Sequence, residues 1–356
     1  MDSAVYIVSS PLHLFVALGL MCGPLRHHRH AVALINQRPQ QRDFLAEALE
    51  ADAERRASVD RFPVVSHFAL PARQVLGDIS AFTARQAPTV LAAGNDAKKE
   101  FYAAVRGCPE ARRVFLEDGL YSYLPVRDSK PPWWQRYRDW RRGLKYGVPV
   151  ERAACLGGSR AIQESYVLMP ERVHAALARK PVHRLEREWF ADPWLRGVCI
   201  AAGEAAGFDA QRCRSIGLLL LPPQLELLQQ SAPLRRRFEA VARAHGERGE
   251  LVAIKRHPRA RDIDSGLGLD LPPEQLIEIP PRLPSEALVP LLSPGTLVVG
   301  ALTTALLTLA LLAEHVTVRS AMSMEPGRGA AARFNNGALR LYEAVGIRPL
   351  EDDAAP

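Results

Sequence analysis

Short apolar runs alternate with amphipathic or alanine-rich stretches along most of the chain, and this alternation restricts the fold more than any other feature. Each run has the length of a buried strand, and each stretch between runs has the length of a helix. In the first part, strands are predicted at 5–8, 31–35, 63–68, 90–93, 114–116 and 166–169, and helices at 12–22, 42–56, 72–85, 97–106 and 194–206. Such alternation is typical of βαβ units, which build a parallel sheet covered by helices.

The same rhythm resumes in the second part of the chain. The predicted strands there are 215–221, 251–255, 276–279, 296–300 and 315–319, and the predicted helices are 224–245, 285–292, 303–312 and 338–345. Since 356 residues suit about two domains, we predict an α/β protein with two Rossmann-like domains. The N-terminal domain would cover 1–211 and the C-terminal domain 212–335. Residues 336–356 would form a final helix and tail, a candidate to pack back on the first domain.

Composition narrows the class of protein. The first residues include Asp2 and no basic cluster, so they predict a strand rather than a signal peptide, and we expect a cytoplasmic protein. The five cysteines are scattered and form no CxxC pair, which predicts free thiols in a reducing compartment. The net charge of +7 favours anionic partners such as a nucleotide, an acidic glycan or the inner membrane leaflet. Because no basic recognition helix or stacked-aromatic motif accompanies it, we predict no binding of nucleic acid.

The run 251–257 (LVAIKRH) is apolar until it ends in two cations and a histidine, followed by Pro258. Open α/β sheets bind ligands outside the carboxyl ends of their strands, and a residue before proline favours an extended conformation. We therefore predict that Lys255, His257 and Pro258 contribute to an anion site. An ordinary strand-to-loop transition is the alternative.

A second candidate group, Glu117-Asp118-Gly119, follows the predicted strand 114–116. Side chains alternate along an extended chain, so one carboxylate can face the ligand while the other anchors the loop. Gly119 permits a sharp turn after them. A partly desolvated carboxylate at this place could take a proton from an acceptor hydroxyl, and the sequence leaves open which of the two does so. A plain Asp-Gly turn is the alternative.

Further candidate turns follow the carboxyl ends of other predicted strands. Thr303 and Thr304 follow Gly300 at a helix start, where hydroxyls and backbone N–H groups can hold a phosphate or simply cap the helix. Glu286 follows a proline turn and could accept from ribose hydroxyls or serve only as a first-turn helix charge. The remaining candidates to line a ligand-binding cleft at these strand ends are Ser9, Ser10, Pro11, Gly94 and Asn95.

Several common motifs are absent from the sequence. No GxGxxG or GxxxxGKS/T follows a predicted strand, which argues against a dinucleotide fingerprint and a P-loop. No HExxH or compact cluster of histidines and carboxylates suggests a metal centre, so we expect no metal or other cofactor. Phosphate charge would then be held by His257, basic side chains, hydroxyls and helix N-termini.

Residues 131–147 break the alternation with aromatic and basic residues in turn. Such a segment can stack on sugar rings, meet anionic lipid headgroups, or pack as an amphipathic helix on its own domain. If it meets the inner leaflet, the contacts would come from Trp133, Trp134, Arg136, Arg138, Trp140, Arg141 and Arg142.

Taken in order, the segments VYIVSSPLHL, LEDG, KRHPR, IEIPPRLPSEAL and GALTTALLTLALL resemble the bacterial polysialyltransferase and lipooligosaccharide sialyltransferase group. The resemblance extends over most of the chain, to LYEAVGI near the end. Its marks are an acidic-acidic-Gly motif, a His-Pro motif and a Ser/Thr pair. The chain departs from the group at 217–219, where relatives often carry Gly-Gln-Pro, and at Arg256, where a small or apolar residue is usual.

The resemblance implies a GT-B fold, with two Rossmann-like domains facing a central cleft. It implies a metal-independent, inverting transfer of sialic acid or a related ulosonic acid, for example a Kdo-like sugar, from a CMP-sugar to a hydroxyl of a cell-surface glycan or glycolipid. By the same resemblance, Glu117 or Asp118 is the base and His257 contacts the donor phosphate as acid or electrostatic stabiliser. Thr303 and Thr304 would hold that phosphate, and Glu286 would meet the ribose.

Two other functions remain open on the sequence. A CDP-polyol phosphotransferase of the teichoic-acid type would have a similar two-domain architecture and a His-Pro at a strand end. A non-catalytic glycan- or lipid-binding protein on a degenerate transferase scaffold would explain the basic aromatic segment.

Overall fold

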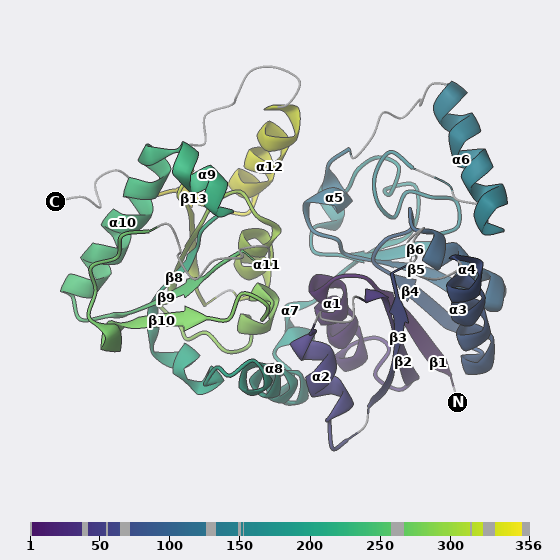
Figure 1. Cartoon of the computed structure of the whole chain (residues 1–356), viewed down its shortest axis with the longest axis horizontal. Coiled ribbons are helices and arrows are strands. Elements are labelled where there is room, and N and C mark those ends of the chain that lie inside the picture. The colour runs from purple at the N-terminus through teal and green to yellow at the C-terminus, as the bar shows by residue number, and fades with distance from the viewer. Residues whose placement is uncertain are drawn as a thin grey trace. The chain divides into compact units, whose positions relative to one another are not determined.

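The computed structural model describes residues 2–37, 42–54, 56–64, 72–125, 133–148, 151, 153–257, 267–313, 315–322 and 332–350. The chain forms two compact units, Met1–Asp192 and Pro193–Pro356, each built around its own parallel sheet (Figure 1). Helix α8 (Pro193–Ala205) belongs to the second unit, where it packs with the short 3-10 helix η2 (Ala210–Ser215). The boundary predicted after residue 211 falls inside η2.

The first unit has a seven-stranded sheet in the order β3-β2-β1-β4-β5-β6-β7, and all neighbouring strands are parallel. The strands are β1 (Ser3–Val8), β2 (Arg29–Gln37), β3 (Ala57–Pro63), β4 (Val90–Ala93), β5 (Arg112–Leu116), β6 (Glu164–Val167) and β7 (Val182–Arg184). The helices are α1 (Pro11–Cys22), α2 (Phe44–Glu50), α3 (Ala72–Gln86), α4 (Lys99–Gly107), α5 (Leu120–Tyr123), α6 (Trp133–Tyr146), α7 (Arg187–Phe190) and the 3-10 helix η1 (Pro170–Arg172).

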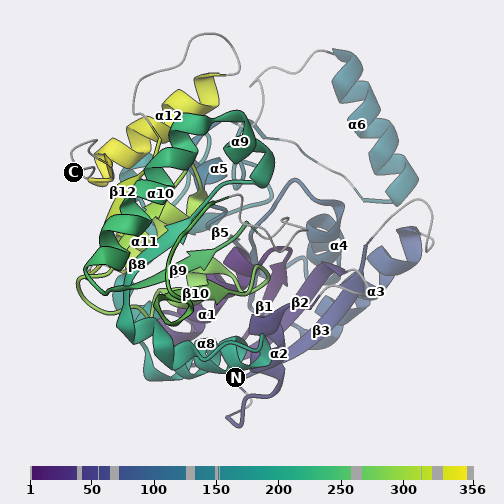
Figure 2. The ribbon, with the colours of Figure 1, turned by 60° about the vertical axis from the view of Figure 1, so that its left-hand side comes forward.

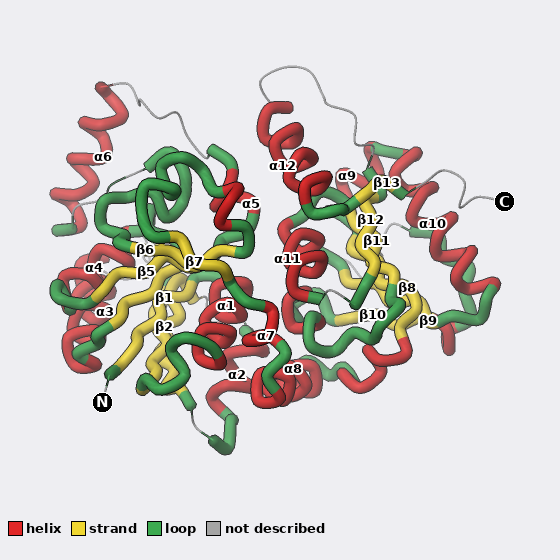
Figure 3. Tube along the Cα trace, turned by 180° about the vertical axis from the view of Figure 1, so that it is seen from behind, coloured by secondary structure: helices red, strands yellow, loops and turns green. Residues whose placement is uncertain are grey.

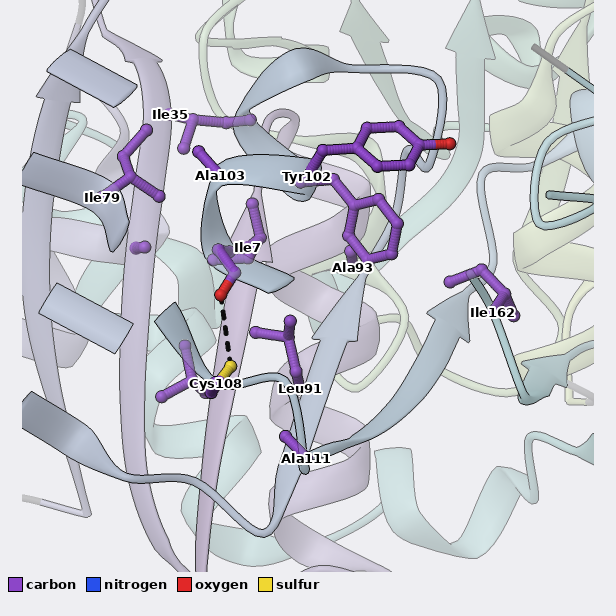
Figure 4. Close-up of a cluster of buried hydrophobic side chains, with 14 of the residues drawn as sticks. Ile7, Ile35, Ile79, Leu91, Ala93, Tyr102, Ala103, Cys108, Ala111 and Ile162 are labelled. Carbon is purple, nitrogen blue, oxygen red and sulfur yellow. Dashed lines mark hydrogen bonds between the residues drawn. The ribbon is translucent and has the colours of Figure 1, made fainter. Parts of the chain in front are cut away.

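Helices α3 and α4 cover one face of this sheet, and α1 and α2 cover the other (Figure 3). Figure 4 shows part of the core beneath α3 and α4, where Ile7 and Leu91 from the sheet lie close to Ile79 and Tyr102. Each such aliphatic side chain contributes roughly 1.5–3 kcal/mol by leaving water. In the same cluster the Cys108 thiol donates to the carbonyl of Ala104 at 3.2 Å. All five cysteines are free thiols, as predicted.

The second unit has a six-stranded parallel sheet in the order β10-β9-β8-β11-β12-β13. Its strands are β8 (Ile216–Leu221), β9 (Leu251–Lys255), β10 (Leu276–Ile279), β11 (Leu297–Gly300), β12 (Thr317–Ser320) and β13 (Arg348–Pro349). Its other helices are α9 (Leu225–Gln230), α10 (Ala232–Glu247), α11 (Thr304–Leu312), α12 (Ala332–Ala344) and the 3-10 helices η3 (Pro273–Gln275) and η4 (Ser285–Leu288). The last element, β13, extends this sheet by pairing with β12.

The fold confirms an α/β protein with two Rossmann-like parallel sheets, but some predicted elements are wrong in detail. The strand predicted at 63–68 is displaced to β3, and residues 65–71 lie outside the described part of the chain. Strand β3 is at the sheet edge and buries only Phe62, so its apolar pattern is weak. The helix predicted at 224–245 breaks at Ser231, whose hydroxyl caps α10 by accepting from Leu234 N–H at 3.4 Å. Within the described ranges, no helix combines the length and apolarity needed to cross a bilayer.

Candidate active site

Both sheets place predicted site residues at the same kind of topological position. In the first unit, β1 is flanked by β2 and β4; in the second, β8 is flanked by β9 and β11. The order of connection therefore reverses beside β1 and beside β8. Open α/β sheets bind ligands outside the carboxyl ends of the strands at such a switch point.

A pocket of about 200 Å³ lies at the carboxyl ends of β8, β9 and β11 in the second unit. Strand β8 ends at Leu221, which is paired in register with Gly300 at the end of β11, so the two strands finish level with each other. Lys255, Arg256 and His257 line the pocket where β9 ends. The predicted strand with a cationic end is thus confirmed, whereas Pro258 lies outside the described residues.

Lys255 is the most buried cation of this pocket. Its Nζ donates to the carbonyls of Arg256 and Pro281, both at 2.9 Å. Burial lowers the pKa of Lys255 to about 8, and the nearby Glu286 carboxyl opposes that shift. Glu286 is buried too, and burial raises its pKa. An ammonium group that has lost most of its water gains more from an anionic ligand than an exposed one does.

The other two basic residues have different surroundings. Arg256 is buried and forms an ion pair with Glu278 on the neighbouring edge strand β10, which fixes its guanidinium. His257 is half-buried and lines the pocket directly. The sialyltransferase group that the chain resembles usually has a small or apolar residue at the position of Arg256. Here the arginine is paired with a carboxylate of the same sheet.

Thr303 completes the pocket from the side of β11. It caps α11 in an extended conformation (φ −146°, ψ 147°), and its hydroxyl accepts from Ala305 N–H at 3.4 Å. Its backbone N–H donates to the Tyr342 hydroxyl at 2.7 Å, and that hydroxyl donates to the Thr303 carbonyl at 2.6 Å. Tyr342 on α12 thus holds this helix start, and sequence reasoning missed it because the contact spans 39 residues.

Three predicted members of this group lie beside the pocket rather than among the residues that line it. Thr304 begins α11, and Glu286 lies in η4, where its neighbour Ser285 lines the pocket. A glycine at position 300 is explained by packing, because an added Cβ would meet Leu306 at 3.0 Å and Leu221 at 3.1 Å. Gly300 therefore lets α11 start close to β8.

In the first unit, Asp118 is held by a histidine. Its Oδ1 lies 2.5 Å from His13 Nε2, and His13 Nδ1 lies 3.2 Å from the Ser9 hydroxyl. A carboxylate only accepts, so Nε2 carries the proton, and in the neutral ring Nδ1 accepts from Ser9. Ser10 caps α1 through its hydroxyl, which accepts from His13 N–H at 3.3 Å, and Pro11 is the first residue of that helix.

Gly94, after β4, leaves room for the His13 ring. An added Cβ at Gly94 would lie 2.2 Å from the imidazole, a contact that real structures do not tolerate. The next residue, Asn95, accepts from Ala97 N–H at 3.1 Å and so stabilises the turn into α4. Residues that follow β1, β4 and β5 therefore meet around one imidazole, as the topology requires.

The two adjacent carboxylates point in opposite directions, as the alternation predicts. Glu117 is fully buried and accepts from the Tyr123 hydroxyl and, at 3.0 Å, from Leu168 N–H. Burial raises the pKa of Glu117 to about 7. The Asp118 side chain is 17% exposed, so it is the carboxylate that a substrate can reach. Gly119 has φ 67°, in the left-handed region that favours glycine, and it is the N-cap residue before α5.

A cation near Asp118, Lys98, was missed by sequence reasoning. Burial lowers the pKa of Lys98, while Glu100 and Asp118 oppose that shift, so the ammonium is close enough to both carboxylates to sense their charge. With its amide oriented for hydrogen bonding, Asn36 accepts from Lys98 Nζ at 2.7 Å and donates to Glu100 at 3.3 Å. Asn36 has φ 60°, a conformation that asparagine tolerates better than most residues. That strained position at the end of β2 gave no signal in the sequence.

Within the described part of the chain, no group of three or more His, Cys, Asp or Glu side chains is arranged to hold a metal ion. In the second unit, the cations of the pocket and the start of α11 can hold an anion.

Comparison with known proteins places the fold. No family model matches the sequence, and no curated protein sequence matches it significantly. Among solved structures, an α/β-galactoside α-2,3-sialyltransferase from Photobacterium phosphoreum is similar, with a TM-score of 0.57, 11% identity, and 99% of this chain and 97% of that chain covered. The GT-B domain of a sialyltransferase from Photobacterium damselae is similar with a TM-score of 0.52, 12% identity and 98% of each chain covered. The chain therefore has the GT-B fold, with two Rossmann-like parallel-sheet units.

Proposed function

We propose that the protein is an inverting, metal-independent glycosyltransferase that moves sialic acid or a related ulosonic acid from a CMP-sugar to a hydroxyl of a cell-surface glycan. The observation that carries the proposal is the pocket of the second unit, which joins Lys255 and His257 to the capped start of α11. Cations together with a helix N-terminus suit a phosphate monoanion. The likeness of the fold to two sialyltransferases supports sialic acid or a related sugar as the transferred group. The choice of a CMP-sugar as the donor is what the sequence resemblance implies.

The donor would bind in this pocket. The CMP phosphate would meet Lys255, His257 and Thr303, with Gly300 and Thr304 shaping the start of α11 behind it. As the bond between the anomeric carbon and the phosphate oxygen breaks, its electron pair passes to that oxygen. His257 would then stabilise the developing charge by a hydrogen bond or by giving up a proton.

Asp118 is our choice for the general base. The acceptor hydroxyl attacks the anomeric carbon and loses its proton to the Asp118 carboxylate, while CMP leaves from the opposite side of that carbon. Asp118 is accessible and is oriented by His13, whereas Glu117 is buried against Tyr123. We therefore assign Glu117 to holding the loop and His13 to positioning the base.

The test starts with binding. In a thermal-shift panel of CMP, CDP, UDP and GDP, we expect CMP to raise the melting temperature most, because a ligand that binds only the folded state stabilises it by mass action. Thr303→Val should reduce that shift, since the variant removes a hydroxyl from the pocket while keeping the side-chain volume. Thr317→Val, the same change at an exposed position of β12, is the matched control.

Turnover then decides between the alternatives. Nuclear magnetic resonance of products from CMP-sialic acid and an oligosaccharide acceptor should show a new glycosidic bond with inverted anomeric configuration. Transfer of a phosphopolyol from a CDP-polyol would replace the proposal with the phosphotransferase. Tight CMP binding without turnover of any CMP-sugar would indicate a binding protein on this scaffold.

A further inference from the structure

Helix α6 carries a stripe of large apolar side chains in contact with water. Trp133, Tyr137, Trp140 and Leu144 follow the spacing i, i+4, i+7 and i+11, which places them on one side of a helix. Their exposed fractions run from 53% to 78%. Of the seven large hydrophobic residues that are exposed in the described part of the chain, five lie on α6, Trp134 being the fifth. We call the four residues in this spacing the aromatic stripe.

The aromatic stripe is exposed, whereas the C-terminal end of α6 is attached to the first unit. Arg73 donates to the carbonyls of Lys145 at 3.0 Å and Leu144 at 3.3 Å, and Tyr146 packs against the core. Tyr146 is two residues beyond Leu144, roughly 200° around the helix axis. In Figures 1 and 2, α6 lies at the periphery of the first unit, outside the layers formed by its sheet and α3 and α4.

This orientation reverses the usual pattern. A helix on the surface of a globular domain buries its apolar side and exposes its polar side. Here intramolecular packing of the aromatic residues, one of the alternatives that the sequence allowed, holds for Tyr146 and fails for the aromatic stripe. The stripe therefore lacks the cover that its own domain would normally provide.

Cations border the aromatic stripe on both sides. Arg138, Arg141 and Lys145 follow one flank of the helix, and Arg136 follows the other; all are exposed. The Arg138 guanidinium lies 5.3 Å from the centre of the Trp134 ring. Asp139 is the single acidic residue in the sequence of α6. If a second copy of the chain docked through the aromatic stripe, the cations of one copy would lie against those of the other. Such like-charge contacts disfavour association.

We propose that α6 docks the protein on an anionic membrane surface. The helix lies in the plane of the lipid headgroups, with the aromatic stripe directed into the interface and the flanking cations paired with anionic lipids. Tryptophan and tyrosine favour this zone because each ring has an apolar body and a polar group, and basic side chains add attraction to negative lipids. Membrane docking by α6 goes beyond the proposed function. Where that function holds, docking brings the enzyme to acceptors that are anchored in lipid.

The experiment uses the full chain and two vesicle compositions. In co-sedimentation with phosphatidylcholine vesicles with and without phosphatidylglycerol, we expect binding to the anionic vesicles and a blue shift of tryptophan fluorescence on binding. Added salt should weaken the binding because it screens the cations. Retention of the protein by anionic vesicles should also fall in a variant that lacks part of the stripe.

Two sets of variants separate the apolar and the ionic contributions. Trp133→Ala combined with Trp140→Ala should lower vesicle affinity at least about ten-fold, a change in binding free energy of roughly 1.4 kcal/mol. Arg138→Gln with Arg141→Gln should lower affinity for anionic vesicles in the same sense. The matched control is Arg236→Gln with Arg243→Gln, which removes two exposed cations from α10 of the second unit. Circular dichroism should show every variant folded, since the changed side chains are exposed.

The result that overturns the proposal is equal vesicle binding by the wild type and the double tryptophan variant, or no binding by either. A molecular mass in light scattering that doubles in the wild type and not in the variant would assign the stripe to a second copy instead. Binding to a soluble anionic polysaccharide, with none to vesicles, would assign it to a glycan. Unchanged transfer to a water-soluble acceptor by the tryptophan variant keeps this test separate from that of the proposed function.

Discussion

The two strand-end sites occupy equivalent places in their sheets and carry opposite chemistry. In the first unit, residues after β1, β4 and β5 meet around His13, which holds the Asp118 carboxylate, whereas in the second unit residues after β8, β9 and β11 surround a pocket with three basic side chains. The backbone arrangement is shared, because both sheets are parallel and reverse their order beside the first strand. The fold therefore determines where a ligand can bind, and the few residues after each strand determine its charge.

The sites also differ in how their ionisable groups are satisfied. Asp118 is already engaged by His13, which is itself held by Ser9 and fits against Gly94. Lys255 has two carbonyl partners and a lowered pKa, so an incoming anion can supply charge compensation that the protein provides only in part. A preorganised carboxylate suits proton transfer, and a partly compensated cation suits ligand binding.

The largest effect should come from Asp118→Asn. The amide keeps the size of the side chain and can still accept from His13 Nε2, but it cannot take a proton from the acceptor. We expect kcat for transfer to fall by ~100 to 10,000-fold, the usual contribution of general acid–base catalysis. The thermal shift caused by CMP should persist, because the pocket assigned to CMP is formed within the second unit.

Normal turnover by the Asp118→Asn variant would contradict the assignment of Asp118 as the general base. Glu117→Gln is the informative companion, since its carboxyl is buried against Tyr123 and takes no part in the proposed proton transfer. Loss of activity in the Glu117 variant with a folded protein and an active Asp118 variant would exchange the roles of the two carboxylates.

A smaller effect on turnover, with an added effect on binding, is expected for His257→Ala. His257 lines the pocket, and removal of one group that stabilises developing negative charge typically lowers kcat by ~100 to 1,000-fold. Unlike the Asp118 variant, this one should also show a smaller thermal shift with CMP. Full kcat in the His257 variant would remove the histidine from the mechanism and leave Lys255 and the start of α11 as the phosphate site.

Sequence reasoning predicted the parts of both sites that depend on local pattern. An apolar run ending in Lys255 and His257, and adjacent carboxylates after β5, are visible because strand length and strand-end chemistry are encoded in a few consecutive residues. The opposite directions of Glu117 and Asp118 follow from the same local geometry. Which of them is exposed depended on Tyr123 and Leu168, one of them far along the chain, and could not be predicted.

The parts that were missed depend on contacts between distant segments. Tyr342 reaches Thr303 from α12, and Asn36 reaches Lys98 from the end of β2. Neither residue stands in a motif, and each looks in sequence like an ordinary helix or strand residue. The outward direction of the aromatic stripe was equally hidden, because the spacing of Trp133 and Trp140 gives the side of the helix and not what that side faces.

The smallest expected effect concerns stability and again separates the two adjacent carboxylates. Glu117 has a folded-state pKa of about 7 against 4.5 for an ordinary glutamate, so between these values the unfolded chain releases a proton that the folded chain keeps. Rising pH in this window therefore favours unfolding, by up to about 1.4 kcal/mol per pH unit from this one group. Glu117→Gln removes that dependence, so its melting temperature should fall less than that of the wild type between pH 5 and about pH 7.

The amide of the Glu117→Gln variant also alters buried hydrogen bonds, an effect that does not depend on pH. The quantity to compare is therefore the slope of melting temperature against pH. Glu110→Gln, at an exposed carboxylate, is the matched control, and equal slopes for all three proteins would show that Glu117 is ionised in the folded state.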